Sequence, residues 1–145
     1  MAAVKDILAR KGTRVWSIGE QATVLQAAQV MNEHKIGALI VMEGDHVAGM
    51  FTERDVLRRV VGEERAPATT TVAEVMTTEI VCCAPQTPIE EARSAMMTRR
   101  IRHLPVVDGE GRLLGLISIG DLNAFEAASR EETIFWMHEY LYGRV

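Results

Sequence analysis

Two copies of a hydroxyl–carboxylate pair are the residues of this chain best suited to ligand chemistry. Thr52 and Asp55 form one pair, and Ser118 and Asp121 form the other with the same spacing. Each pair follows an apolar run and precedes a helical pattern, so the hydroxyl and carboxylate can cap a helix. At such a helix start, unpaired N–H groups attract phosphate, and a nearby carboxylate can accept hydrogen bonds from a ribose diol. The pairs are therefore compatible with helix capping, with nucleotide binding, or with both.

A second group of candidate residues begins an apolar run in each half of the chain. Arg102 and His103 precede the run LPVV, whereas the corresponding positions before LIVM hold Gly37 and Ala38. A cationic pair can neutralise a phosphate, and a glycine–alanine pair cannot. If both places bind a ligand, we expect them to differ in their affinity for phosphate.

These motifs belong to an internal duplication. The segment TVLQAA, which begins at Thr23, returns as TPIEEA 64 residues later at Thr87. The segment GMFTERD at Gly49 returns as GLISIGD 66 residues later at Gly115. A duplication of this length indicates two copies of a small unit that pack against each other, because one copy is too small to bury a good core alone.

The hydrophobic pattern predicts the same order of elements in both copies: strand, helix, strand, strand, helix. In the first copy these are expected at residues 15–18, 23–35, 38–42, 47–51 and 55–61. In the second copy they are expected at residues 80–83, 88–99, 104–107, 113–118 and 121–128. The fold class is therefore α/β, of the mixed α+β kind.

The predicted organisation is a first repeat with a leading helix at 1–62, a linker at 63–71, a second repeat at 72–128 and a helical tail at 129–145. The leading helix carries an apolar stripe of Val4, Ile7 and Leu8. This stripe either covers the other half of the same chain or forms a subunit contact. The same two alternatives apply to the apolar and aromatic tail.

Composition excludes several classes of function. The chain has 145 residues, is 48% hydrophobic and has a formal net charge of −4, which argues against nucleic acid as a partner. No apolar run is long enough for a membrane span, and a cytoplasmic location is the simplest expectation. Cys82 and Cys83 are adjacent on a predicted strand, so their side chains point apart and do not suit a disulfide. No metal-ligand cluster or catalytic centre is evident, and we expect no enzyme, metal or catalytic cofactor.

Taken together, the motifs resemble the tandem cystathionine-β-synthase (CBS) domain pair, in its stand-alone bacterial form. The likeness rests on the paired segments VKDIL and VAEVM, IGALIVM and IRHLPVVD, and GMFTERDVL and GLISIGDL. It implies two β-α-β-β-α repeats packed pseudo-symmetrically through their sheets, with two clefts between them. It also implies a homodimer and an adenosyl ligand such as AMP, ADP, ATP, NAD or S-adenosylmethionine.

Carried onto this chain, the resemblance assigns two sets of ligand-binding residues. The preferred cleft comprises Thr52, Arg54, Asp55, Ile80, Ile101, Arg102 and His103. The second cleft comprises Val15, Trp16, Ile36, Gly37, Ala38, Ser118 and Asp121. Because the second cleft lacks the cationic pair, we expect it to bind weakly, to take a less charged ligand or to stay empty.

The resulting functional hypothesis is a non-enzymatic regulatory module that binds an adenine nucleotide and signals through its conformation or through contacts with an unidentified protein partner. The alternative is a dimeric interaction scaffold that works without nucleotides. In that case the apolar tail would supply the functional surface.

Overall fold

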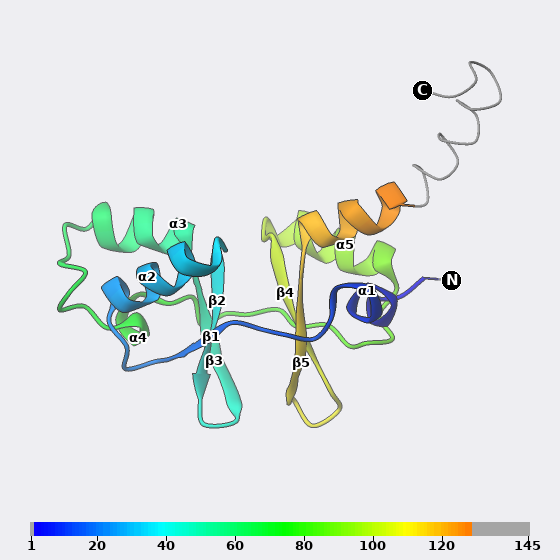
Figure 1. The fold of residues 1–145 in the computed structure, drawn as a ribbon, viewed down its shortest axis with the longest axis horizontal. Coiled ribbons are helices and arrows are strands. Elements are labelled where there is room, and N and C mark those ends of the chain that lie inside the picture. Colours follow the sequence, from blue (N-terminus) through cyan, green and yellow to red (C-terminus); the bar gives the residue numbers. More distant parts are fainter. Residues whose placement is uncertain (1, 129–145) are drawn as a thin grey trace, which may run out of the picture.

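The computed structural model describes residues 2–128, which form two mixed α+β units lying side by side (Figure 1). We call the left-hand unit in this view the first repeat and the right-hand unit the second repeat. The first repeat contains β1 (Ser17–Gly19), α2 (Val24–His34), β2 (Ala38–Glu43), β3 (His46–Thr52), α3 (Glu53–Asp55) and η1 (Val56–Val61). The second contains α5 (Ile89–Arg99), β4 (His103–Val107), β5 (Leu113–Ser118) and a helix described over residues 119–128. The predicted fold class is confirmed.

The two repeats share details of backbone geometry. In the first, β1 pairs with β2 in parallel and β2 pairs with β3 in antiparallel; in the second, β4 pairs with β5 in antiparallel. The register shifts after Val41 in one repeat and after Val106 in the other. Helices α2 and α5 both end in the left-handed conformation, at Lys35 and Arg100. The duplication seen in the sequence is thus a duplication of conformation.

The predicted strand at residues 80–83 is wrong, because this segment makes only an isolated parallel bridge between Cys83 and Val106. In the first repeat, the N–H of Ile40 donates to the carbonyl of Trp16 at 3.3 Å as β1 joins β2. The residue that corresponds to Ile40 is Pro105, which has no N–H to donate. The parallel ladder therefore cannot extend toward residue 81.

The helix predicted at residues 55–61 begins two residues earlier and changes type. Its first turn, α3, is α-helical, and η1 continues it as a π-helix. The backbone bonds Gly62 N–H to Leu57 O (2.8 Å) and Arg65 N–H to Val60 O (2.9 Å) show the wider spacing. By contrast, Thr23 caps α2 as predicted, because its hydroxyl accepts from the Gln26 N–H at 3.1 Å.

Each repeat receives a short helix from the segment that leads into the other repeat. Helix α1 (Val4–Lys11) lies beside β5 of the second repeat, whereas α4 (Val72–Val75) lies with the first repeat (Figure 1). Ile7 joins a buried core with Leu104 and Ile117, and Val75 joins one with Leu39. The leading stripe therefore covers the other half of the same chain. The tail, residues 129–145, lies outside the described residues.

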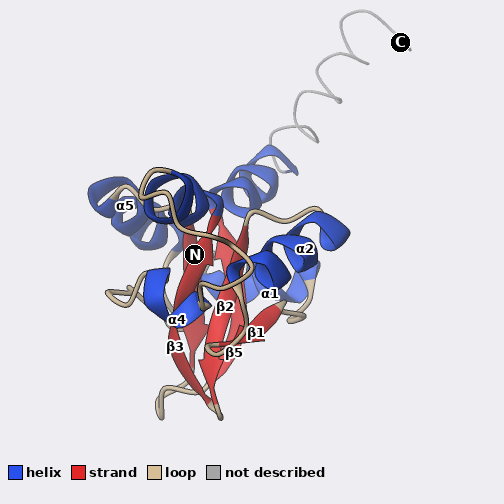
Figure 2. Cartoon of the chain, turned by 90° about the vertical axis from the view of Figure 1, so that its left-hand side faces the viewer, coloured by secondary structure: helices blue, strands red, loops and turns tan. Residues whose placement is uncertain are grey.

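A third apolar cluster joins the two sheets. Its buried members are Ala38, Ile40 and Met50 of the first repeat, and Leu113 and Leu116 of the second repeat pack against them. Figure 2 shows the strands gathered at the centre, with helices around them. The sheets thus pack face to face, and the helices lie on the outside.

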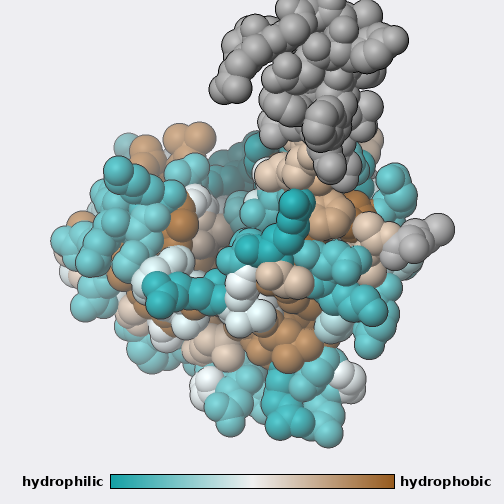
Figure 3. Space-filling model, turned by 45° about the vertical axis from the view of Figure 1, so that its right-hand side comes forward, coloured by the Kyte–Doolittle hydropathy of each residue, from teal (hydrophilic) through white to brown (hydrophobic). Residues whose placement is uncertain are grey.

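The surface is mixed in character. On the face drawn in Figure 3, apolar groups appear in separate areas between hydrophilic ones. Leu57, Val61 and Met97 are more than half exposed, on η1 and α5. Among residues 2–128, no helix is both long and apolar enough to cross a membrane.

If α1 is part of the second repeat's core, substitution of Ile7 by Ala should destabilise the whole protein. Ile7 is 2% exposed, so we expect a loss of about 2–5 kcal/mol in the free energy of unfolding, as for other large-to-small core substitutions. Urea unfolding measures this, with Leu57→Ala as the matched control because Leu57 is 64% exposed. Equal, small losses in the two variants would show that α1 is not integral to the core.

Candidate functional site

A cavity of about 320 Å³ lies between residues of the two repeats and includes the Thr52–Asp55 motif. We call it the Asp55 cleft. Its wall is formed by Gly37, Met50, Thr52, Glu53, Arg54, Asp55, Thr77, Glu79, Ile80, Val81, Arg100, Ile101, Arg102 and His103. All seven residues predicted for the preferred cleft therefore lie together around one cavity. Their role in binding stays a prediction.

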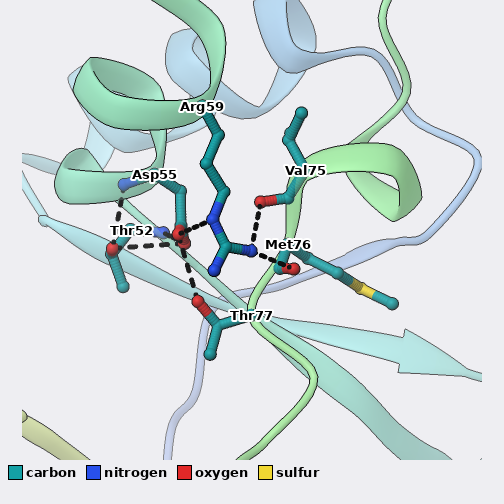
Figure 4. Close-up of polar contacts among 6 residues, drawn as sticks. All are labelled: Thr52, Asp55, Arg59, Val75, Met76 and Thr77. Atoms are coloured by element: carbon teal, nitrogen blue, oxygen red, sulfur yellow. Dashed lines mark hydrogen bonds and ion pairs between the residues drawn. The ribbon is translucent and has the colours of Figure 1, made fainter. Parts of the chain in front are cut away.

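Asp55 is the buried acid of this cleft, only 5% exposed (Figure 4). Its Oδ2 accepts from the Thr52 N–H at 3.0 Å and from the Thr52 hydroxyl at 3.3 Å. Its Oδ1 accepts from the Thr77 hydroxyl at 3.0 Å. The motif therefore does cap the helix, as the sequence suggested, and Asp55 is also one of the residues that line the cavity. A carboxylate has about four acceptor positions, so these bonds leave acceptor capacity for a further donor.

Arg59 contacts both this carboxylate and the carbonyl groups at the end of α4 (Figure 4). Its Nε lies 3.7 Å from Asp55 Oδ1, and its Nη1 donates to the carbonyls of Met76 (2.9 Å) and Val75 (3.3 Å). Thr77 follows directly and reaches the other side of the same carboxylate oxygen. Residues 72–79 precede the second repeat, and we call them its lead-in; residues 4–11 are the lead-in of the first repeat. The position of Asp55 is thus set jointly by its own helix and by the lead-in of the second repeat.

The second repeat contributes cationic groups to the same cleft. Arg102 and His103 stand at the start of β4, and Arg100 stands at the left-handed end of α5. Arg54 reaches across from the first repeat, where its Nη1 donates to the Arg100 carbonyl at 3.3 Å. Both repeats therefore contribute positive charge to one cavity.

The surroundings of His103 disfavour its protonated form. Burial lowers the pKa of its imidazole, and the neighbouring Arg102 guanidinium lowers the pKa further. Asp121 and Glu53 act in the opposite direction, but they do not reverse the shift. A neutral histidine beside guanidinium groups can take up a proton when an anion arrives.

Four further lining residues with polar or charged side chains were not predicted from the sequence: Glu53, Thr77, Glu79 and Arg100. Thr77 and Glu79 follow VAEVM, the segment that pairs with VKDIL, so this pairing could have drawn attention to them. Arg100 is exposed in an otherwise ordinary helix end, and no sequence signal distinguished it. Acids and guanidinium groups thus share this cavity, which suits a ligand with separate donor and anionic parts.

The residues predicted for the second cleft are not gathered in the same way. Gly37 lies in the Asp55 cleft instead, because the Glu53 N–H donates to its carbonyl at 3.0 Å and draws the start of β2 to that wall. Asp121 lines a separate cavity of about 280 Å³ with residues of α1. Ser118 caps the helix at Asp121, whose N–H donates to Ser118 Oγ at 3.1 Å.

The other four members of the second set lie in packed positions. Val15 and Ala38 belong to the cluster between the sheets. Trp16 and Ile36 pack on the core of the first repeat, and the Trp16 ring stacks on His34 with centroids 3.5 Å apart. None of the four lines either of these two cavities.

The cysteines do not form a reactive pair. Both are free thiols; Cys82 is exposed and Cys83 is half-buried. Burial raises the pKa of both thiols, to about 11 for Cys83, where the adjacent Cys82 adds to the effect. The thiolate is the nucleophilic form, so these shifts oppose thiol chemistry near neutral pH. Across residues 2–128, no group of three or more histidine, cysteine or acidic side chains is placed to hold a metal ion.

Comparison with known proteins agrees with the duplicated fold. The family model "CBS domain" matches the chain twice, at residues 4–62 and 72–127. The "CBS domain-containing protein YhcV" of Bacillus subtilis is 37% identical over 122 residues, which are 84% of each chain.

Solved structures show the same relationship. A candidate signal-transduction protein with CBS domains from Burkholderia ambifaria is 42% identical, with a TM-score of 0.84, covering 88% of this chain and 95% of that one. The CBS domain pair of protein MJ0100, solved with 5-methylthioadenosine and S-adenosyl-L-methionine, has the same fold at 22% identity, with a TM-score of 0.78 and coverage of 89% and 98%. The chain described here therefore belongs to the CBS domain family and contains two of its repeats.

Proposed function

We propose that this protein is a non-enzymatic regulatory module that binds an adenosyl ligand, of the AMP, ADP, ATP or NAD type, in the Asp55 cleft. The observation that carries the proposal is that Asp55, from the first repeat, lines one cavity together with Arg102 and His103, from the second. A carboxylate suits a ribose diol, and guanidinium groups suit phosphate. The two kinds of group come from different repeats, which suits a nucleotide with its ribose and phosphate as separate parts.

A ligand in this position would contact both repeats. Its binding energy would then depend on how the repeats are placed, and by linkage it would favour one placement over others. Thr77 and Arg59 add a route to the lead-in of the second repeat, because both contact the Asp55 carboxylate. A ligand that moves this carboxylate would therefore also shift the contacts that Arg59 and Thr77 make at the end of α4, outside the cleft.

The names of two relatives support both the proposed class of ligand and the proposed regulatory role. The pair from protein MJ0100 was solved with two adenosyl compounds, and the Burkholderia protein is described in terms of signal transduction. A hexameric CBS-CP12 protein from cyanobacteria shows that one relative assembles into an oligomer. The homodimer, the protein partner and the cytoplasmic location of the present chain stay predictions.

The ribose assignment predicts that Asp55→Asn lowers AMP affinity by at least about tenfold. This is the typical contribution of a hydrogen bond to a charged group, and asparagine keeps the shape of the side chain while losing one acceptor oxygen. We would measure affinity by isothermal titration calorimetry, with Asp121→Asn as the matched control in the equivalent position of the other repeat. Dideoxy-AMP, which lacks the diol, should bind the wild type and Asp55→Asn equally. Unchanged AMP affinity in Asp55→Asn would contradict the assignment.

The position of His103 predicts that AMP affinity rises as the pH falls from about 8 toward 6.5, near the ordinary imidazole pKa. A phosphate beside His103 would raise the lowered imidazole pKa, so binding would take up a proton and a lower pH would favour it. Adenosine has no phosphate and should show no such dependence. AMP with the variant His103→Gln should take up no proton, because its phosphate, with a second pKa of about 6, can only release one on binding. Calorimetry in two buffers of different ionisation enthalpy measures the proton uptake. Equal uptake in the wild type and His103→Gln would exclude His103 as the group.

A further inference from the structure

The carboxylate of the second repeat has a different partner from that of the first. The Lys11 Nζ lies 2.6 Å from Asp121 Oδ2 and also donates to the Leu116 carbonyl at 2.8 Å. The Ser118 N–H donates to the same Oδ2 at 2.8 Å, just as the Thr52 N–H donates to Asp55. Asp121 thus keeps the capping geometry of the motif, and an ammonium of the same chain has been added to it.

Lys11 is the last residue of α1, which leads into the first repeat but packs on the second repeat. When VKDIL is aligned with VAEVM, Lys11 corresponds to Glu79. Glu79 lines the Asp55 cleft but cannot donate a hydrogen bond as a carboxylate. The donor from that lead-in is the hydroxyl of Thr77 instead. The two lead-ins therefore place a neutral hydroxyl against Asp55 and an ammonium against Asp121. Asp55 also faces the Arg59 guanidinium of its own helix, but at 3.7 Å, compared with 2.6 Å for Lys11 and Asp121.

This difference determines how readily a ribose could reach each carboxylate. A ribose hydroxyl can replace or join the Thr77 hydroxyl with little net change, because both are neutral donors. Replacement of Lys11 would break a short charge-assisted bond and leave its ammonium without that partner. The Lys11 and Asp121 side chains are 34% and 24% exposed, so solvent screens the pair only in part. The buried residues Val4, Ile7 and Leu8 hold α1, and hence Lys11, in place.

We propose that Lys11 occupies the ribose position of the second repeat and thereby limits the protein to one adenosyl ligand per chain. The proposal rests on the function proposed above. It adds an explanation of what keeps ligand away from the second motif, Ser118–Asp121. Release of Lys11 would leave Asp121 free to accept the diol of an adenine nucleoside. Asp121 lines its cavity together with Arg10 of α1. The released site would therefore offer the Asp121 carboxylate to a ribose diol and the Arg10 guanidinium to a phosphate.

The test is the number of ligands bound per chain, measured by calorimetry with AMP and with adenosine. We expect one site in the wild type and two in Lys11→Met, which keeps an unbranched apolar side chain and loses the charge. The second site should bind both adenosine and AMP, and it should disappear in Lys11→Met combined with Asp121→Asn. Lys11→Arg, which keeps the positive charge, should retain a single site. Lys5→Met is the matched control, because Lys5 is an exposed lysine on the same helix.

Several outcomes would overturn the proposal. Two sites in the wild type would show that Lys11 does not block Asp121, and one site in both the wild type and Lys11→Met would show that its release opens nothing. Either result leaves the Asp55 cleft intact as the ligand site. Absence of binding in every variant would overturn the proposed function and this inference together. Circular dichroism checks that Lys11→Met is folded, and Lys11→Gln, a more polar neutral variant, takes its place if it is not.

Discussion

The exchange of lead-in helices between the repeats is the constraint on which the rest of the structure depends. Each repeat has an outer core to which two of its own helices contribute buried residues. The remaining cover comes from α1 on the second repeat and α4 on the first. The apolar residues between the sheets, Ile40 and Met50 against Leu113 and Leu116, complete the packing. Neither repeat can therefore form its native core without the other, and their relative placement is part of the fold.

The same constraint creates the candidate site. Because the chain crosses between the repeats after each lead-in helix, residues at the end of that helix or just after it lie beside the helix start of the opposite repeat. Thr77 meets Asp55 in this way, and Lys11 meets Asp121. The cleft is thus assembled from three parts of the sequence: a capping motif, a lead-in and the strand start with Arg102. Small differences between the lead-ins are enough to make two similar carboxylates chemically different.

Much of this arrangement could be predicted from the sequence, because repeated motifs and apolar periodicity are local signals. The cap at Thr23, the paired strands and the seven lining residues of the preferred cleft follow from such signals and from the family resemblance. The missing N–H of Pro105 also indicated that residues 80–83 would not form a strand, but their continuous apolar run gave the opposite indication. The π-helical turn and the packing of Trp16 depend on tertiary contacts that a single sequence does not reveal. The ion pair of Lys11 with Asp121 joins residues 110 positions apart, so only the fold could reveal it.

The central claim is that an adenosyl ligand bridges the repeats by contacting Asp55 of the first repeat and Arg102 of the second. A crystal structure of the protein grown with AMP tests it most directly. We predict one AMP per chain, with the ribose hydroxyls within hydrogen-bond distance of the Asp55 carboxylate and the phosphate beside Arg102 and His103. AMP bound at Asp121 instead, or an empty Asp55 cleft at saturating AMP, would contradict the account.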